Sequence, residues 1–196
     1  KVLRIFSRFF TIFCIAMIIN AFNLFDGING LSLSYFTIIF LYLSLKFQKT
    51  EFIPIIFICM ILIYYNLRNK IFLGDSGVYI LSTLLGLSMI KIHNFANNLF
   101  SAENIFLLLM VPGIDMIRVF FERILNKKMF FTPDKNHLHH IFLRNFGETR
   151  TLCFLISFLI FPIITYETNF LPTYIIIFLS LLAYVIIISY FKLNAK

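Results

Sequence analysis

The chain has 196 residues, of which 60% are hydrophobic and only 13% are charged, and its mean hydropathy is +0.92. A soluble domain needs a larger share of polar residues to cover its surface, so this composition excludes a soluble globular domain and predicts a membrane protein. The three cysteines lie inside apolar stretches without metal-ligand spacing, so we expect reduced thiols and no disulfide framework: Cys14, Cys59 and Cys153.

Seven apolar stretches predict an all-α, polytopic helical bundle that forms a single domain over residues 1–196. A helix that crosses the hydrocarbon core of a bilayer needs roughly 20 apolar residues, and shorter helices are accommodated by local thinning. In chain order the stretches cover residues 9–25, 31–47, 52–66, 77–92, 104–121, 151–166 and 171–191. The polar stretch 122–150 is too long for a simple turn and is predicted to be a cytoplasmic loop that contains histidines.

The distribution of Lys and Arg predicts the orientation. With seven spans, the segments that follow the first, third, fifth and seventh spans emerge on the same side of the membrane. That side carries Arg68, Lys70, Arg123, Lys127, Lys128, Lys135, Arg144, Arg150, Lys192 and Lys196. The other side carries Lys46, Lys49 and Lys91, together with Lys1, Arg4 and Arg8 if the N-terminus lies there. The positive-inside rule makes the first side cytoplasmic. The net charge of +8 is therefore interpreted as a topology signal and not as evidence for nucleic-acid binding.

The first polar motif, "NAFNLFDGING" at residues 20–30, lies at the end of the first span. Asn20 and Asn23 are three residues apart and share a helix face, and Asp26 follows them. Gly27 and Gly30 open the next span, where a ligand such as phosphate could reach backbone N–H groups at a helix N-terminus. An Asx-type turn between two membrane helices is the alternative, but buried amides are costly without a partner and favour a functional role.

The second motif, "FLGDSG" at residues 72–77, precedes the fourth span. Asp75 lies where a cytoplasmic loop enters the helix, so it is either a helix N-cap or a metal ligand, and this motif alone favours the cap. Asn66 and Lys70, just upstream, either position a phosphate or cap a helix end.

The third motif, "VPGIDMIRVFFER" at residues 111–123, combines helix breakers with charges. Pro112 and Gly113 are predicted to break the fifth span. Asp115 and Arg118 form an ionisable pair in or near the membrane, with either a structural or a catalytic role. The basic residues that follow are interpreted as a positive-inside flank or as contacts to a nucleotide diphosphate: Arg123, Lys127 and Lys128.

The fourth motif, "PDKNHLHH" at residues 133–140, contains three of the four histidines. The H-x-H-H pattern has no paired cysteines or second ligand group at zinc-finger spacing, so it does not predict a structural zinc site. A solvated loop without a function remains an alternative. Three imidazoles on the same side of the membrane as two acidic motifs favour a functional cluster.

Together, these motifs resemble the signatures of the polyprenyl-phosphate N-acetylhexosamine-1-phosphate transferases, a glycosyltransferase family 4 group. The H-x-H-H form is similar to the undecaprenyl-phosphate GlcNAc-1-phosphate transferase branch, and the resemblance covers residues 20 to about 142. Asn29 stands where bacterial relatives usually have a second aspartate, and Val78 replaces a common serine. Family members have further spans and an upstream Asp-Asp motif, so the resemblance implies either a missing N-terminal part or a remnant of the family fold.

The resemblance implies an enzyme of the bacterial cytoplasmic membrane whose active site faces the cytoplasm. In such enzymes, undecaprenyl phosphate attacks a UDP-N-acetylhexosamine, UMP is released, and cell-surface glycan synthesis, such as that of lipopolysaccharide, begins. The implied partners are these two substrates and the lipid bilayer, with a homodimer as a further option, and Mg²⁺ or Mn²⁺ is the implied cofactor. An inactive scaffold of the same fold and a small transporter remain alternatives, although a transporter would concentrate polar residues at the bilayer midplane.

By carry-over from the family, each site residue has an expected role. The catalytic residues are expected to be Asp26, Asp75, His137, His139 and His140. The substrate-binding residues are expected to be Asn20, Asn23, Gly27, Asn66, Lys70 and Arg123. Asp75 and Asn23 are expected to be the metal ligands, and the imidazoles supply N–H donors and adjustable positive charge against phosphate.

Overall fold

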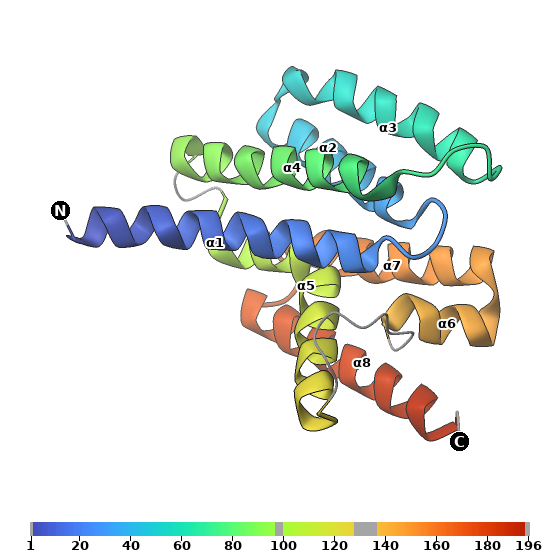
Figure 1. Cartoon of the computed structure of the whole chain (residues 1–196). Coiled ribbons are helices and arrows are strands. Elements are labelled where there is room, and N and C mark those ends of the chain that lie inside the picture. Colours follow the sequence, from blue (N-terminus) through green and yellow to red (C-terminus); the bar gives the residue numbers. More distant parts are fainter. Residues whose placement is uncertain (1, 97–99, 128–136, 195–196) are drawn as a thin grey trace.

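In the computed structural model, residues 2–96, 100–127 and 137–194 are described, and these residues form helices and connections without a strand. The helices are α1 (Val2–Phe25), α2 (Leu31–Phe47), the 3₁₀ helix η1 (Thr50–Phe52), α3 (Ile53–Asn66), α4 (Gly74–Ala96), α5 (Ala102–Leu125), α6 (Leu138–Phe146), α7 (Glu148–Glu167) and α8 (Thr173–Asn194) (Figure 1). Each of the seven predicted spans corresponds to one of these helices.

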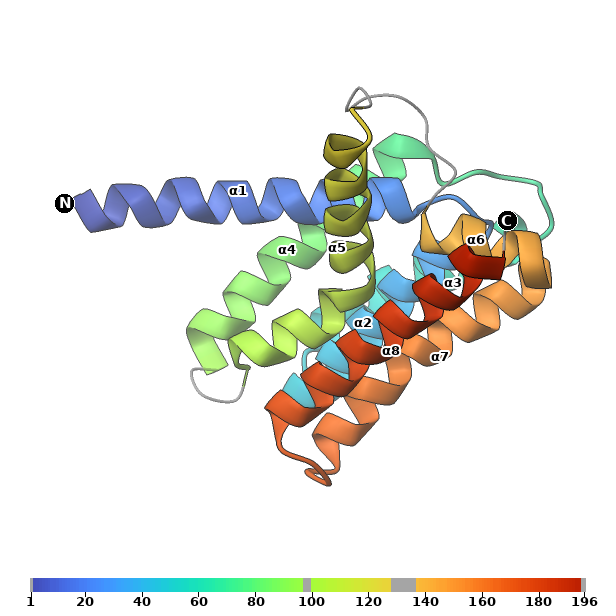
Figure 2. The same cartoon turned by 90° about the horizontal axis from the view of Figure 1, so that it is seen from below.

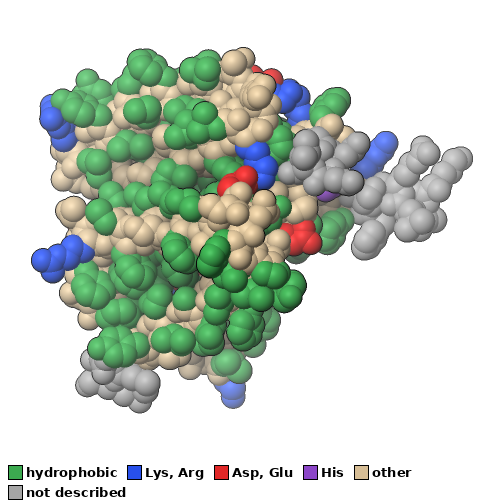
Figure 3. All heavy atoms as spheres, turned by 180° about the vertical axis from the view of Figure 1, so that it is seen from behind, with side chains coloured by type: hydrophobic (Ala, Val, Ile, Leu, Met, Phe, Trp, Pro, Cys, Tyr) green, Lys and Arg blue, Asp and Glu red, His purple; other side chains and the backbone are tan. Residues whose placement is uncertain are grey.

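Five helices within the described residues are long and apolar enough to cross a membrane: Arg8–Phe25, Gly74–Phe95, Ala102–Leu125, Glu148–Glu167 and Thr173–Phe191. The apolar helices Leu31–Phe47 and Thr50–Asn66 are shorter. Large hydrophobic side chains are exposed along the helices, and they cover much of the face in Figure 3, where most Lys and Arg side chains lie near the edges. Such a surface suits lipid, so the prediction of an all-α, polytopic membrane protein is confirmed.

The core forms where α2 lies among α3, α4 and α7, while α1 packs against α4 and α5. Aromatic side chains fill it: the rings of Phe22 and Phe36 stack with their centroids 4.4 Å apart, and Phe25 meets Tyr35 edge to face at 4.8 Å. The Tyr35 hydroxyl donates a hydrogen bond of 3.1 Å to the Leu155 carbonyl, which ties α2 to α7. This packing fixes the end of α1, where the first polar motif begins.

The polar motifs gather at one end of the helices. Figure 1 shows the connection after α1, the connection after α3 and helix α6 at this end, which we call the motif end. The α2–η1 connection and the C-terminal end of α4 lie at the opposite end. At that opposite end, Lys91 pairs with Glu51 at 3.2 Å, and Lys46 pairs with Glu167. This arrangement is the one expected from the alternation of the spans.

Two expectations about residues 104–150 need correction. Pro112 and Gly113 do not end the fifth span, because α5 is continuous from Ala102 to Leu125 and instead changes direction along its length (Figures 1 and 2). Proline removes one helical hydrogen bond and kinks a helix without ending it when apolar neighbours continue the packing. The stretch 122–150 is also not entirely a loop, because it contains α6 at Leu138–Phe146.

Residues 128–136, including Lys128, Lys135 and the first half of the fourth motif, lie outside the described residues.

Candidate active site

A pocket of about 320 Å³ opens at the motif end between the α1–α2 turn and the α3–α4 connection. It brings together Asp26 and Asp75, the two carboxylates of the first and second motifs. The pocket is lined by Asp26, Gly27, Ile28, Asn29, Asn66, Phe72, Leu73, Gly74 and Asp75. Four of the predicted site residues, Asp26, Gly27, Asn66 and Asp75, therefore share one cavity.

The two carboxylates differ in their surroundings. Asp26 is partly buried directly after α1, and its backbone N–H donates to the Phe22 carbonyl at 3.0 Å. Burial raises the pKa of Asp26 above its ordinary value, and the negative charge of Asp75 raises it further. Asp75 is exposed in the first turn of α4. A positive charge between the two groups would relieve their repulsion.

Asn66 holds the walls of the pocket together. Its Oδ1 accepts a hydrogen bond of 2.5 Å from the backbone N–H of Gly30, and its Nδ2 donates one of 2.9 Å to the Ile71 carbonyl. Gly30 has φ of +79°, a left-handed conformation that suits glycine. Asn29 strengthens the same junction by donating to Asn69 Oδ1 at 2.6 Å. Both ends of the buried Asn66 amide are thus engaged by backbone, so Asn66 shapes the pocket that it lines.

The other predicted polar residues lie outside the pocket lining. Asn20 is exposed, and its Nδ2 approaches Met116 Sδ on α5 at 3.4 Å. Asn23 Oδ1 is buried without a hydrogen-bond partner among the described residues. Lys70 is exposed, and Arg123 is buried near the end of α5. None of these four residues is among those that line the pocket.

The three histidines of the fourth motif begin α6. His137 is the N-cap residue with extended backbone, and His139 and His140 lie in the first turn. His137 and His139 are buried, and their rings are nearly parallel with centroids 5.7 Å apart. The His140 ring lies 4.2 Å from that of His139 and is partly exposed. The three histidines thus form a packed cluster and do not lie in a solvated loop.

His139 joins this cluster to the first motif. Its ring meets Phe25 edge to face at 6.1 Å, and a Cβ atom on Gly27 would overlap the imidazole. Neither ring nitrogen of His139 has a hydrogen-bond partner among the described residues. Burial, aided by the neighbouring His140, lowers the pKa of His139 to about 3. Gly27 therefore makes room for a neutral imidazole, and His139 links the fourth motif to the pocket.

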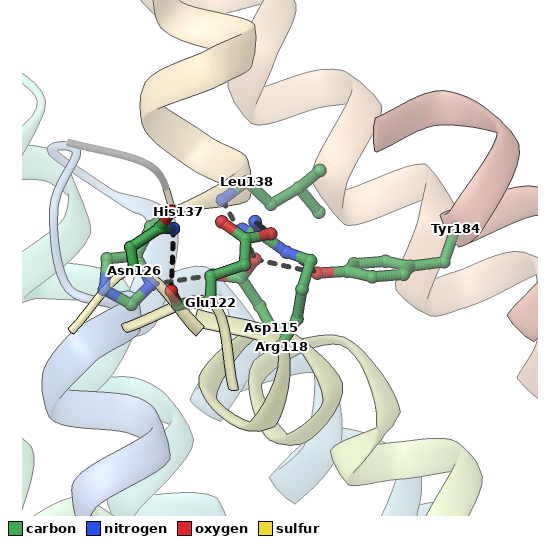
Figure 4. Close-up of polar contacts among 7 residues, drawn as sticks. All are labelled: Asp115, Arg118, Glu122, Asn126, His137, Leu138 and Tyr184. Atoms are coloured by element: carbon green, nitrogen blue, oxygen red, sulfur yellow. Dashed lines mark hydrogen bonds and ion pairs between the residues drawn. The ribbon is translucent and has the colours of Figure 1, made fainter. Parts of the chain in front are cut away.

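A polar network around Asp115 supports the histidine cluster from below (Figure 4). Arg118 Nη2 donates to Asp115 Oδ1 at 2.7 Å, and the Tyr184 hydroxyl donates to the same oxygen at 2.8 Å. His137 Nδ1 lies 2.8 Å from Asp115 Oδ2, and the Leu138 N–H donates to Oδ1 at 3.0 Å. The predicted ion pair between Asp115 and Arg118 is present, as part of a network that joins α5, α6 and α8.

The comparisons with known proteins agree with the motifs. The pattern that defines glycosyl transferase family 4 matches residues 1–93. An undecaprenyl-phosphate alpha-N-acetylglucosaminyl 1-phosphate transferase of Thermotoga maritima is 35% identical over 159 residues, which cover 79% of this chain and 49% of the relative. Proteins of the same name from Escherichia coli K12 and Salmonella typhi are 29% and 30% identical, with 93% of this chain and 54% of each relative covered. The chain belongs to glycosyl transferase family 4.

This glycosyl transferase family 4 chain spans about half the length of the curated relatives it matches. No solved structure gives a significant match. All residues that line the pocket, from Asp26 to Asp75, lie within the matched residues 1–93. The histidine cluster follows them in the chain and packs against the same turn.

The two carboxylates that line the pocket, Asp26 and Asp75, are suitable ligands for the divalent cation that the family resemblance implies. Within the part of the chain that the structure describes, no group of three His, Cys, Asp or Glu side chains could enclose a metal ion. Mg²⁺ does not need such a cage, because it is commonly held by one or two carboxylates together with water and substrate phosphates. Asp26 and Asp75 would supply that donor set, whereas Asn23, the other predicted ligand beside Asp75, does not line the pocket.

The burial of His139 predicts an acid-sensitive fold. The pKa is about 3 in the folded protein and 6.5 ordinarily, so between these values the unfolded chain binds more protons and the free energy of unfolding falls as the pH is lowered. We expect the thermal midpoint in detergent to fall between pH 7.5 and pH 5, and His139→Gln to reduce this fall. His93→Gln, at an exposed histidine of α4, is the control that should keep the full fall. An equal fall in His139→Gln and the parent would contradict the assignment.

Sequence reasoning missed Tyr184, which lies 69 residues from Asp115 in a helix without a polar motif. The sequence of an apolar helix does not indicate which distant residue the hydroxyl of one of its tyrosines will contact. The backbone contacts of Asn66 were also not predictable from the sequence, because a buried amide can bind either backbone or substrate and only its orientation distinguishes them.

Proposed function

We propose that the protein transfers N-acetylglucosamine 1-phosphate from UDP-N-acetylglucosamine to undecaprenyl phosphate and releases UMP. The observation that carries this proposal is the packing of the histidine cluster against the turn that bears Asp26, opposite Asp75. The names of the relatives support the acceptor lipid and the transferred group. The positive-inside rule supports a pocket that faces the cytoplasm, where nucleotide sugars are found.

The reaction exchanges one phosphoanhydride bond for another. An oxygen of the lipid phosphate attacks the β-phosphorus of the UDP-sugar and forms a new P–O bond. The bond from the β-phosphorus to the bridging oxygen breaks, and its electron pair leaves with UMP. Because atoms and charge balance without a covalent enzyme intermediate, the protein contributes mainly positioning and charge neutralisation.

Asp26 and Asp75 would hold the divalent cation at the mouth of the pocket. When bound, Mg²⁺ or Mn²⁺ supplies positive charge that neutralises a diphosphate. Burial and, to a smaller extent, the charge of Asp75 raise the pKa of Asp26, and a bound cation would favour the ionised form of both groups. The pocket volume of about 320 Å³ suits part of a ligand, not a whole nucleotide sugar.

The histidine cluster has two kinds of members. We expect His137 and His140 to contact the nucleotide phosphates, with Arg123 as a further cation from α5. Because the Nδ1 proton of His137 is directed at Asp115, this residue donates from Nε2 only as an imidazolium. His139 has a different role, because its neutral ring is enclosed between Phe25, Gly27 and the other two imidazoles. It holds the cluster against the Asp26 turn. The cluster therefore combines binding with alignment of the two motifs.

Release of UMP tests the proposed function. The purified gene product that carries this sequence is incubated in detergent with UDP-N-acetylglucosamine, and UMP is measured by chromatography. We expect UMP only when undecaprenyl phosphate and Mg²⁺ are both present. Release that is independent of the lipid would indicate a hydrolase. A folded protein without any UMP release would instead favour a non-catalytic scaffold.

A further inference from the structure

The buried carboxylate of Asp115 is fully occupied by groups from three helices. Its two oxygens face Arg118 from its own helix, Tyr184 from α8, and His137 and the Leu138 N–H from α6. Figure 4 shows these groups converging on it. Its side chain is only 2% exposed, so it cannot itself contact a substrate from the pocket. Any effect of Asp115 on the reaction must pass through one of its partners.

We propose that Asp115 is a positioning residue that fixes the imidazole of His137 and the first turn of α6 for the transfer reaction. This inference rests on the proposed function. A carboxylate can only accept hydrogen bonds, so the Nδ1 of His137 must carry the proton in this contact. The partner of Nδ1 therefore sets the tautomer of the imidazole, and Nε2 is the nitrogen left to face a ligand.

Asp115 also determines where α6 begins. The N-cap residue His137 makes no side-chain capping hydrogen bond, and the Asp115 carboxylate from α5 accepts the N–H of Leu138 at the first helical position instead. A negative charge at a helix N-terminus stabilises the helix. The same turn carries His139, whose ring lies against Gly27. Asp115 therefore fixes the first turn of α6, and this turn places the His139 ring against Gly27, next to Asp26.

Simple helix packing does not account for this arrangement. The contact of α5 with α8 is already made by Arg118, which donates through Nε to the Tyr184 hydroxyl at 2.9 Å. Burying a carboxylate is costly unless it is paired and hydrogen-bonded, and well-packed apolar residues often hold helices together equally well. The bonds to His137 and Leu138 are the ones that connect the carboxylate to the motif end.

A direct test uses nuclear magnetic resonance of the gene product with ¹⁵N-labelled histidine, where His137→Gln identifies the His137 signals. We expect His137 in the parent to be protonated at Nδ1. Asp115→Asn should change this pattern, because its amide can donate to Nδ1 and so favour the other tautomer. Tyr184→Phe is the matched control, since it removes one bond from the same carboxylate without touching His137, and it should preserve the pattern. Protonation of neutral His137 at Nε2 alone in the parent would overturn the proposal without any need for a variant.

The second part of the test measures kcat of the transferase reaction. If Asp115 acts through His137, Asp115→Asn should lower kcat at least about tenfold in the parent and less than about twofold in the His137→Gln background. Tyr184→Phe should lower kcat less than about threefold. Equal factors for Asp115→Asn in both backgrounds would show that Asp115 acts independently, and the proposal would fail. If the parent lacks transferase activity, the proposed function fails, whereas the resonance arm still decides the link between Asp115 and His137.

Discussion

Asp75→Asn is expected to lower transferase activity at least about a hundredfold while leaving the amount of folded protein in the membrane unchanged. Asp75 is exposed in the first turn of α4, so asparagine can occupy the position without a packing defect. Asparagine is also a good residue at a helix start, so the helix retains its local stabilisation. The lost property is the negative charge beside Asp26. Turnover of UDP-N-acetylglucosamine in the gene product measures this effect.

The control for Asp75→Asn is Glu51→Gln. Glu51 is an exposed carboxylate that pairs with Lys91 at the opposite end of the helices, so it should leave turnover within about twofold of the parent. Asp26→Asn should resemble Asp75→Asn, and each variant should require a higher Mg²⁺ concentration for its residual activity. Near-normal activity of Asp75→Asn at low Mg²⁺ would reduce Asp75 to a helix-capping residue.

Gly27→Ala is expected to have the second large effect, because the added methyl group would overlap the ring of His139. The imidazole is enclosed by Phe25 and the other histidines, so it cannot move without disturbing them. Overpacking of this kind costs about 1–3 kcal/mol of folding free energy. We expect a lower thermal midpoint together with a loss of turnover of at least about tenfold, since the Asp26 turn and the histidine cluster would separate.

Gly113→Ala provides the same chemical change at a harmless position. Nothing lies within 4 Å of a Cβ atom placed on Gly113, and alanine is the better helix former. Its thermal midpoint and turnover should match or exceed those of the parent. A Gly27→Ala protein that is as stable and as active as Gly113→Ala would contradict the close packing of His139 against the turn.

The helices were predictable because the signal for a membrane helix is local. Each apolar stretch identifies a helix by its local composition, and the predicted span 31–47 coincides with α2. Helix α6 is short and lies within a polar stretch, so length alone did not reveal it. Its apolar residues Leu138, Ile141 and Phe142 nevertheless follow helical spacing and are buried, which is a signal that could have found it.

The candidate site was predictable at the level of motifs but not of individual contacts. Span alternation placed Asp26 and Asp75 on one side of the membrane, and the structure brings both to one pocket. The direction of a side chain depends on tertiary packing, so the sequence could not show that Asn66 binds backbone at both ends or that His139 is enclosed. The contact between Asp115 and Tyr184 spans 69 residues and depends on how α5 meets α8.

Transfer of phosphorus with the sugar is the property that most directly tests the proposed chemistry. The gene product would be given undecaprenyl phosphate and UDP-N-acetylglucosamine labelled with ³²P at the β-phosphate and with ³H in the sugar, and the lipid fraction would be extracted. We expect both labels to enter the lipid in equal molar amounts and Asp75→Asn to lower both at least about a hundredfold. Tritium in the lipid without ³²P would contradict transfer of the sugar together with its phosphate. The absence of both labels from the lipid, when undecaprenyl phosphate and Mg²⁺ are supplied, would contradict the proposed reaction as a whole.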